Sequence, residues 1–153
     1  MSTVITYGTF DLFHIGHLRI LERAAQLGDR LIVGVSTDEF NALKGKKCVI
    51  PYEHRSSIVG AIKCVDLVIP ENNWEQKSSD IELHGADYLV MGSDWEGKFD
   101  NFSNKCEVKY LERTSDVSTT SLKEALSSVS EEKIAEIQKG LDQIRGVIGQ
   151  LGQ

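Results

Sequence analysis

The sequence predicts an α/β protein: a Rossmann-like parallel sheet with helices on both faces, followed by a C-terminal helical extension. Short apolar runs alternate with amphipathic helical patterns along most of the chain, which is typical of parallel strands joined by crossover helices. Residues 31–35 are apolar throughout, as expected for a strand covered on both faces. The 153 residues suffice for one main domain with a substantial core.

Five runs are predicted to be strands, because each is short, rich in β-branched or aromatic side chains and bounded by turn residues. Gly8 follows the first run and Gly92 follows the fourth. The five runs are residues 4–7, 31–35, 65–69, 88–91 and 107–111.

The helices are predicted from apolar positions three or four residues apart and from the residues that start or stop them. Gly28 closes the first helix and Gly85 stops the fourth, while Pro51 suits the first turn of the third. The predicted helices are residues 15–27, 38–43, 51–63, 76–84, 119–126 and 131–150.

Composition and charge argue against several classes of protein. The net charge of −6 disfavours non-specific nucleic-acid binding, which needs a basic face. No apolar run approaches the roughly 20 residues of a membrane span, so no membrane insertion is expected. Cys48, Cys64 and Cys106 are widely spaced and odd in number, which indicates neither a disulfide framework nor a zinc site. With no secretory leader visible, a cytoplasmic location is expected.

The stretch TYGTFDLFHIGHLRIL, residues 6–21, places a candidate anion site where the first strand meets the first helix. A helix N-terminus presents unpaired N–H groups and the positive end of the helix dipole. Gly8 and Gly16 let the backbone approach a phosphate closely, and His14 and His17 project from one side of the first turn. Taken alone, the two histidines are better explained as a chance pair on a helix surface, and the whole string is far more specific than the pair. A metal site is disfavoured, because no nearby Cys or Glu completes a ligand set.

Two motifs carry a resemblance to a known family. The string GTFDxxHxGH, residues 8–17, resembles the signature of the cytidylyltransferases among the HIGH-motif nucleotidyltransferases. The string RTSDVSTTSL, residues 113–122, resembles the second signature of that family. The stretches STDEFN, YEHR, NWEQK and MGSDWEGKFD are more narrowly similar to bacterial members that act on glycerol 3-phosphate. The similarity spans about residues 3–126.

The resemblance implies a reaction in which CTP and glycerol 3-phosphate give CDP-glycerol and pyrophosphate. The acceptor phosphate would attack the α-phosphorus of CTP in line and without a covalent enzyme intermediate, so catalysis would depend on positioning and charge stabilisation. The product would serve the synthesis of a teichoic-acid-like or capsular polymer. Mg²⁺ is implied by the triphosphate and would be bound mainly through CTP, with no dedicated metal site in the protein.

The same resemblance assigns roles to individual residues. The residues expected to be catalytic hold the triphosphate and the charge of the transition state; they are His14, His17, Lys46 and Arg113. The CTP site would further include Thr9, Phe10, Ile15, Gly16, Lys63, Thr114, Ser118, Thr119 and Thr120. The residues expected at the acceptor are Asp11, Lys44, Arg55, Trp74, Lys77 and Asp94.

Several of these residues also have simpler interpretations. Asp11 suits a helix-entry cap, Trp74 suits the core, and residues 44–47 suit a solvated basic loop. Residues 121–124, SLKE, fit a capping box, so part of the second signature is explained by capping alone.

Two positions depart from the family pattern. Asp116 stands where glycine is usual, and an acid beside a triphosphate is unfavourable unless it points outward. Lys63 stands where arginine is usual, which keeps the charge but loses the bidentate geometry of the guanidinium.

The last part of the chain forms a separate prediction, with a main domain at residues 1–128 and a helical tail at 129–153. Apolar positions in the tail follow one another at alternating steps of three and four, as in a heptad seam. They are Ile134, Ile137, Leu141, Ile144, Ile148 and Leu151. The seam predicts a homodimer or higher homo-oligomer, with packing on the chain's own domain as the alternative.

Other functions stay open at this point. The chemistry with CTP is compatible with a different acceptor, such as phosphoethanolamine, phosphocholine or a phosphorylated amide. Another nucleotide is a further variant, as in the adenylyltransferases that carry the HIGH string. A non-catalytic nucleotide-binding module is the alternative from a different class.

Overall fold

The computed structural model describes residues 1–113 and 118–152. The chain folds as two compact units, Met1–Val117 and Ser118–Gln153. The predicted boundary after residue 128 lies inside the second unit, within a single helix. Each unit is described by itself below.

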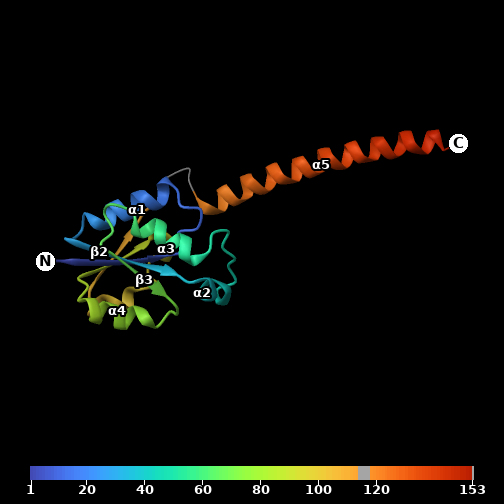
Figure 1. The fold of residues 1–153 in the computed structure, drawn as a ribbon. Coiled ribbons are helices and arrows are strands. Elements are labelled where there is room, and N and C mark those ends of the chain that lie inside the picture. The colour runs from blue at the N-terminus through green and yellow to red at the C-terminus, as the bar shows by residue number, and fades with distance from the viewer. Residues whose placement is uncertain (114–117, 153) are drawn as a thin grey trace. The chain divides into compact units, whose positions relative to one another are not determined.

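The first unit is built on a five-stranded parallel sheet, which confirms the predicted fold class (Figure 1). The strand order is β3-β2-β1-β4-β5, so the order reverses between β1 and β4. In such sheets the crevice at the carboxyl ends of the strands is the usual place for a ligand. The strands are β1 (Thr3–Gly8), β2 (Arg30–Ser36), β3 (Leu67–Glu71), β4 (Tyr88–Gly92) and β5 (Glu107–Leu111).

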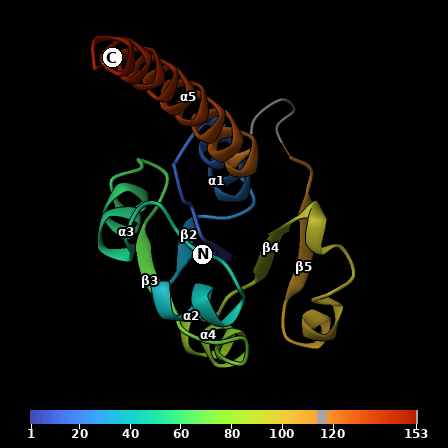
Figure 2. The same cartoon turned by 90° about the vertical axis from the view of Figure 1, so that its right-hand side faces the viewer.

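Helices cover both faces of the sheet, and α4 lies on the opposite side from α1 in both views (Figures 1 and 2). One core cluster joins Leu21 of α1 and Val59 of α3 to alternate strand residues, and the other joins Ile81 of α4 to the remaining ones. The helices of this unit are α1 (Ile15–Ala25), α2 (Asp38–Leu43), α3 (Tyr52–Gly60) and α4 (Gln76–His84), with short 3₁₀ turns η1 (Ser93–Trp95) and η2 (Asp100–Asn104).

The apolar run at residues 31–35 is covered on both faces, as predicted. Leu31 and Val33 point into the cluster beneath α1 and α3, whereas Ile32 points into the cluster beneath α4. All three side chains are at most 1% exposed. The run therefore supplies both cores at once, which is why it shows no polar alternation.

The third strand begins and ends two residues later than predicted, at Leu67–Glu71. Pro70 was not expected in a strand, because proline cannot donate to the ladder. It is accommodated because β3 is an edge strand, paired only with β2 among the described strands. The shift brings Glu71 to the carboxyl end of the strand.

The third helix is shorter than predicted. Pro51 is its N-cap and the helix ends at Gly60, so Lys63 does not lie on it. Lys63 is exposed in the turn that precedes β3. The predicted extension of this helix to residue 63 is therefore wrong; the helix ends at Gly60 with Ala61 as its C-cap.

The second unit is one continuous helix, α5 (Thr119–Leu151), rather than the two helices predicted. Residues 127–130 include no glycine or proline that would stop a helix, and serine costs little within a helix. The predicted seam residues are between 45% and 83% exposed. No helix in the described part of the chain is both long enough and apolar enough to cross a membrane.

Gly34 offers a test of the packing between β1 and β2. A Cβ atom added at Gly34 would lie 2.3 Å from Cδ1 of Tyr7, the residue paired with it in the ladder. We expect Gly34→Ala to lower the free energy of unfolding by about 1–3 kcal/mol through overpacking. Urea unfolding would measure the change.

Gly60→Ala is the matched control, because its added Cβ would lie 3.6 Å from Val68, an ordinary contact. We expect it to change the free energy of unfolding by less than about 1 kcal/mol. Equal stability of the Gly34 variant and the unmodified chain would contradict the packing described here.

Candidate active site

The carboxyl ends of the parallel strands meet at one edge of the sheet. Gly8 ends β1, Ser36 ends β2, Glu71 ends β3 and Gly92 ends β4. The segments that follow these residues carry most of the predicted site residues, so the sheet gathers them at the place where a ligand is expected.

The turn after β1 has an unusual backbone. Phe10 and Leu12 have φ angles of 55° and 50°, in the left-handed region that non-glycine residues rarely adopt. The Phe10 ring is buried, and a Cβ atom at Gly8 would lie 2.8 Å from its Cε2. Gly8 is therefore needed for the close approach of this ring, a requirement that is separate from the predicted approach of a phosphate.

His14 and His17 form a reciprocal cap at the start of α1. Nδ1 of His14 accepts from the backbone N–H of Gly16 at 3.0 Å, and Nδ1 of His17 accepts from the N–H of His14 at 3.2 Å. The two rings stack with their centroids 4.0 Å apart. Because Nδ1 accepts in both residues, each neutral ring carries its proton on Nε2, the nitrogen that donates to a phosphate oxygen.

Both histidines are held in the neutral form. Burial lowers the pKa of His14 and lowers that of His17 to about 4, with a further lowering from neighbouring His14 and an opposing effect of Asp11. The rings of Phe10 and Phe13 lie 5.5 and 5.3 Å from the His17 ring and supply much of this apolar surrounding. At neutral pH the pair therefore acts as two oriented hydrogen-bond donors rather than as two cations.

Arg55 was predicted at the acceptor, but its side chain is buried, and nearly all of its N–H groups donate to other parts of the chain. Nη1 donates to the backbone oxygens of Thr9 and Ser36, each at 2.7 Å, and Nε donates to Ile50 at 2.8 Å. Nη2 pairs with Asp38 at 2.7 Å. Arg55 thus joins the ends of β1 and β2 to the start of α2, and this positioning role replaces the predicted contact with the acceptor.

Asp11 is likewise buried and anchors a loop. Its two carboxylate oxygens accept from the backbone N–H groups of Val49 and Ile50 at 2.8 and 2.9 Å. The acceptor contact predicted for Asp11 is therefore corrected to a structural one, which holds the loop after α2 against the β1–α1 turn.

The loop after α2 carries the basic residues of the site. Thr9 Oγ1 donates to the side chain of Asn41, and the backbone oxygen of Asn41 accepts from the N–H of Lys46 at 2.8 Å. Gly45 has a φ angle of 73°, which lets the chain turn sharply between Lys44 and Lys46. The backbone of Lys46 is thus held by Asn41, whereas the Lys46 side chain is exposed.

A polar cluster lies at the ends of β2 and β3. Lys77 on α4 is 1% exposed and pairs with Glu71, with 2.5 Å between Nζ and Oε2. The Ser36 hydroxyl donates to the other oxygen of Glu71 at 2.6 Å and accepts from Nζ of Lys44 at 3.3 Å. Two of the predicted acceptor residues, Lys44 and Lys77, are therefore brought together through Ser36 and Glu71.

Trp74 lies against both lysines rather than inside the core. Its ring centroid is 5.5 Å from Nζ of Lys44 and 5.0 Å from Nζ of Lys77. The residue is 42% exposed, and its ring also contacts the rings of Phe40 and Trp95. The arrangement stabilises the two ammonium groups by cation–π attraction at the open side of the cluster.

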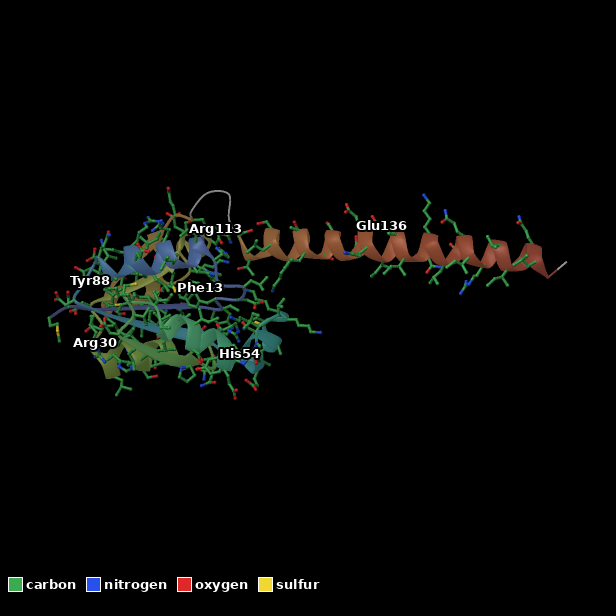
Figure 3. All side chains as sticks on the ribbon, turned by 45° about the horizontal axis from the view of Figure 1, so that its top comes forward. Phe13, Arg30, His54, Tyr88, Arg113 and Glu136 are labelled. Atoms are coloured by element: carbon green, nitrogen blue, oxygen red, sulfur yellow. The ribbon has the colours of Figure 1, made fainter. Side chains whose placement is uncertain are left out.

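Arg113 and Asp94 form an exposed ion pair at the ends of β5 and β4. Figure 3 marks Arg113 at this end of β5, together with Phe13 on the turn after β1. Asp94 was predicted at the acceptor, but in the structure its carboxylate pairs with Arg113.

Lys63 was predicted at CTP, but it lies before β3, near the amino ends of the strands. It therefore does not join the other residues within this unit.

The second signature is divided between the two units. Thr114 and Asp116 lie outside the described residues. Ser118 is the N-cap of α5 and accepts from the N–H of Ser121 at 3.0 Å, so the cap lies three residues earlier than the predicted capping box. Thr119 and Thr120 lie in the first turn of α5.

Ile15, which was predicted at the CTP site, lies at the start of α1, and its side chain is 44% exposed.

Sequence reasoning missed Ser36, Asn41 and Glu71. Their signal was position rather than motif, since Ser36 and Glu71 each end a parallel strand. Among the residues that the structure describes, no group of three or more His, Cys, Asp or Glu side chains forms a metal site.

The chain was compared with known proteins. The family model described as "Cytidylyltransferase-like" matches residues 5–125. A glycerol-3-phosphate cytidylyltransferase of Bacillus subtilis is 58% identical over 129 residues, which are 84% of this chain and 100% of that protein. A glycerol-3-phosphate cytidylyltransferase of Staphylococcus aureus is 54% identical over 126 residues, which are 82% of this chain and 96% of that protein.

A solved structure agrees on the fold. The lipopolysaccharide core biosynthesis protein of Thermoplasma volcanium superposes with a TM-score of 0.64 at 23% identity, covering 75% of this chain and 99% of that chain. With the family match over most of its length and relatives above 50% identity, this chain belongs to the cytidylyltransferase-like family.

Proposed function

We propose that this chain transfers CMP from CTP to glycerol 3-phosphate, giving CDP-glycerol and pyrophosphate. The observation that carries the proposal is the 58% identity to a glycerol-3-phosphate cytidylyltransferase over the whole length of that relative. The capped histidine pair and the lysine cluster at one edge of the sheet also support the proposal, because both supply groups that can bind phosphate. No observation favours a different acceptor or a non-catalytic module.

In the proposed reaction, a phosphate oxygen of glycerol 3-phosphate attacks the α-phosphorus of CTP, and pyrophosphate leaves. His14 and His17 donate from Nε2 to phosphate oxygens as negative charge develops on them. Neutral, pre-oriented donors suit this task, because they need no reorganisation during the reaction. Lys46 and Arg113 supply positive charge to the triphosphate, and Lys44 and Lys77 attract the acceptor phosphate.

Mg²⁺ is part of the proposal as a partner of CTP. The two acidic side chains among the predicted site residues are already engaged, Asp11 with the backbone of the loop and Asp94 with Arg113. The nucleotide is therefore proposed to supply most of the ligands, and the ion neutralises charge on the triphosphate. The cytoplasmic location and the polymer served by the product stay predictions of the sequence.

A substrate panel tests the function. The protein is incubated with Mg²⁺, each nucleoside triphosphate in turn and a set of acceptors including glycerol 3-phosphate, phosphocholine and phosphoethanolamine, and pyrophosphate release is measured. CTP with glycerol 3-phosphate is expected to give the highest rate, and chelation of Mg²⁺ to abolish it. Release with ATP alone, or without preference among the acceptors, would refute the proposal.

Substitution of His14 separates capping from catalysis. Asparagine is a strong N-cap and places an amide oxygen near the position of Nδ1, but it has no counterpart of Nε2. We expect His14→Asn to fold with near-normal thermal stability and to lose roughly 10²–10³ in turnover.

His14→Ala is the comparison, since it removes the cap as well and should also lower stability by about 1 kcal/mol. Near-normal turnover of the asparagine variant would show that Nε2 of His14 has no role in the reaction.

We further propose that the chain forms a homodimer or higher homo-oligomer through the apolar seam of α5. The seam residues from Ile134 to Leu151 are exposed within their unit, and their spacing suits a helix of the same kind. Light scattering after size exclusion should give a multiple of 17.0 kDa for the full chain and a smaller assembly for a chain ending at Ser128. The same number of subunits in both would place the contact elsewhere.

A further inference from the structure

We propose that Glu71 is the positioning residue of the acceptor site, holding the ammonium group of Lys77 directly and that of Lys44 through the hydroxyl of Ser36. The inference rests on the proposed function for the identity of the acceptor, a small phosphate. It concerns a residue that no motif singled out and that reaches the site only because β3 ends there.

The contact between Glu71 and Lys77 is buried on both sides. The two side chains are 4% and 1% exposed, and Nζ of Lys77 is within 5.3 Å of the ring centroids of Tyr7, Trp74 and Phe99. A lysine in such an apolar setting keeps a fixed position only if an anion faces it, because an unpaired buried charge is very costly. Glu71 supplies that anion.

Ser36 extends this control to the second lysine. A hydroxyl has one proton, and Ser36 gives it to Oε1 of Glu71, so its lone pairs are turned toward Nζ of Lys44. The backbone of Ser36 is itself held by Arg55, whose Nη1 donates to the carbonyl oxygen of Ser36 at 2.7 Å. The hydroxyl is therefore a fixed link between the carboxylate and the more exposed of the two lysines.

The charges in this cluster leave an excess of one positive charge beside an open tryptophan face. Burial lowers the pKa of Lys44, and Lys46 and Lys77 lower it further, whereas Glu71 and Cys48 act in the opposite direction. Glu71 thus helps to keep Lys44 protonated and able to attract a phosphate dianion. Loss of the carboxylate charge should release both lysines from their places and make Lys44 lose its proton at a lower pH.

Steady-state kinetics of Glu71→Gln test the proposal. Glutamine keeps the size of the side chain and an acceptor for Ser36 but removes the charge. We expect KM for glycerol 3-phosphate to rise at least about tenfold while KM for CTP changes less than about twofold, since charge-assisted contacts are lost at one substrate only. The alkaline limb of kcat/KM for the acceptor should move to lower pH, and Glu71→Asp should partly restore it.

NMR titration of isotopically labelled lysine gives a readout that needs no substrate. The Lys44 side chain is expected to titrate at lower pH in Glu71→Gln than in the unmodified protein. Ser36→Ala leaves the Glu71–Lys77 pair in place and should raise KM for the acceptor less than Glu71→Gln does. This variant serves as the test if Glu71→Gln does not fold. Glu82→Gln is the matched control, because it removes an exposed pair with Lys105 and should change neither KM.

An unchanged Lys44 titration, or an equal rise of both KM values, would overturn the positioning role of Glu71. Absence of CDP-glycerol formation by the unmodified protein would instead overturn the proposed function. In that case the lysine titration alone still decides whether Glu71 controls Lys44.

Discussion

The buried guanidinium of Arg55 is the interaction on which the geometry of the site depends. It is 1% exposed and donates to the chain at the ends of β1 and β2, to Ile50 in the following loop and to Asp38 at the start of α2. A charge in this position is tolerated because nearly all of its N–H groups have partners. The pKa of Asp38 is lowered by hydrogen bonds from the backbone of Tyr52 and from Arg55, so this end of the network stays ionised. Removal of the guanidinium would remove one donor from the backbone oxygens of Thr9, Ser36 and Ile50.

Two different kinds of phosphate-directed group are arranged around this network. The histidines after β1 are neutral, because burial lowers the pKa of both and reciprocal capping orients both. The lysines at the ends of β2 and β3 are cations whose positions depend on a shared carboxylate. Neutral oriented donors suit charge that appears during a reaction, whereas cations suit charge that a substrate already carries. The division agrees with the proposed reaction, in which the histidines act on the nucleotide and the lysines attract the acceptor phosphate.

Much of the fold was predictable from local pattern. Alternating elements identified the parallel sheet, the apolar run at residues 31–35 identified a strand covered on both faces, and Gly85 stopped its helix as expected. The errors concern the ends of helices: α3 ended at Gly60, earlier than the apolar pattern indicated, and the serines after Leu126 did not interrupt α5. Proline in β3 was acceptable because the strand lies at the edge of the sheet, which sequence spacing does not reveal.

By itself the sequence determined the fold class and the family, because these follow from periodicity and from short contiguous motifs. The tertiary structure decided which charged side chains are buried and bonded to other parts of the chain. Arg55 and Asp11 look like phosphate-directed residues in the sequence, yet Arg55 donates to the backbone oxygen of Thr9, 46 residues away, and Asp11 accepts from the backbone N–H of Val49, 38 residues away. Glu71 and Ser36 carry no motif and meet because β2 and β3 are neighbours in the sheet. Such roles are set by long-range pairing and burial, which only the folded chain brings about.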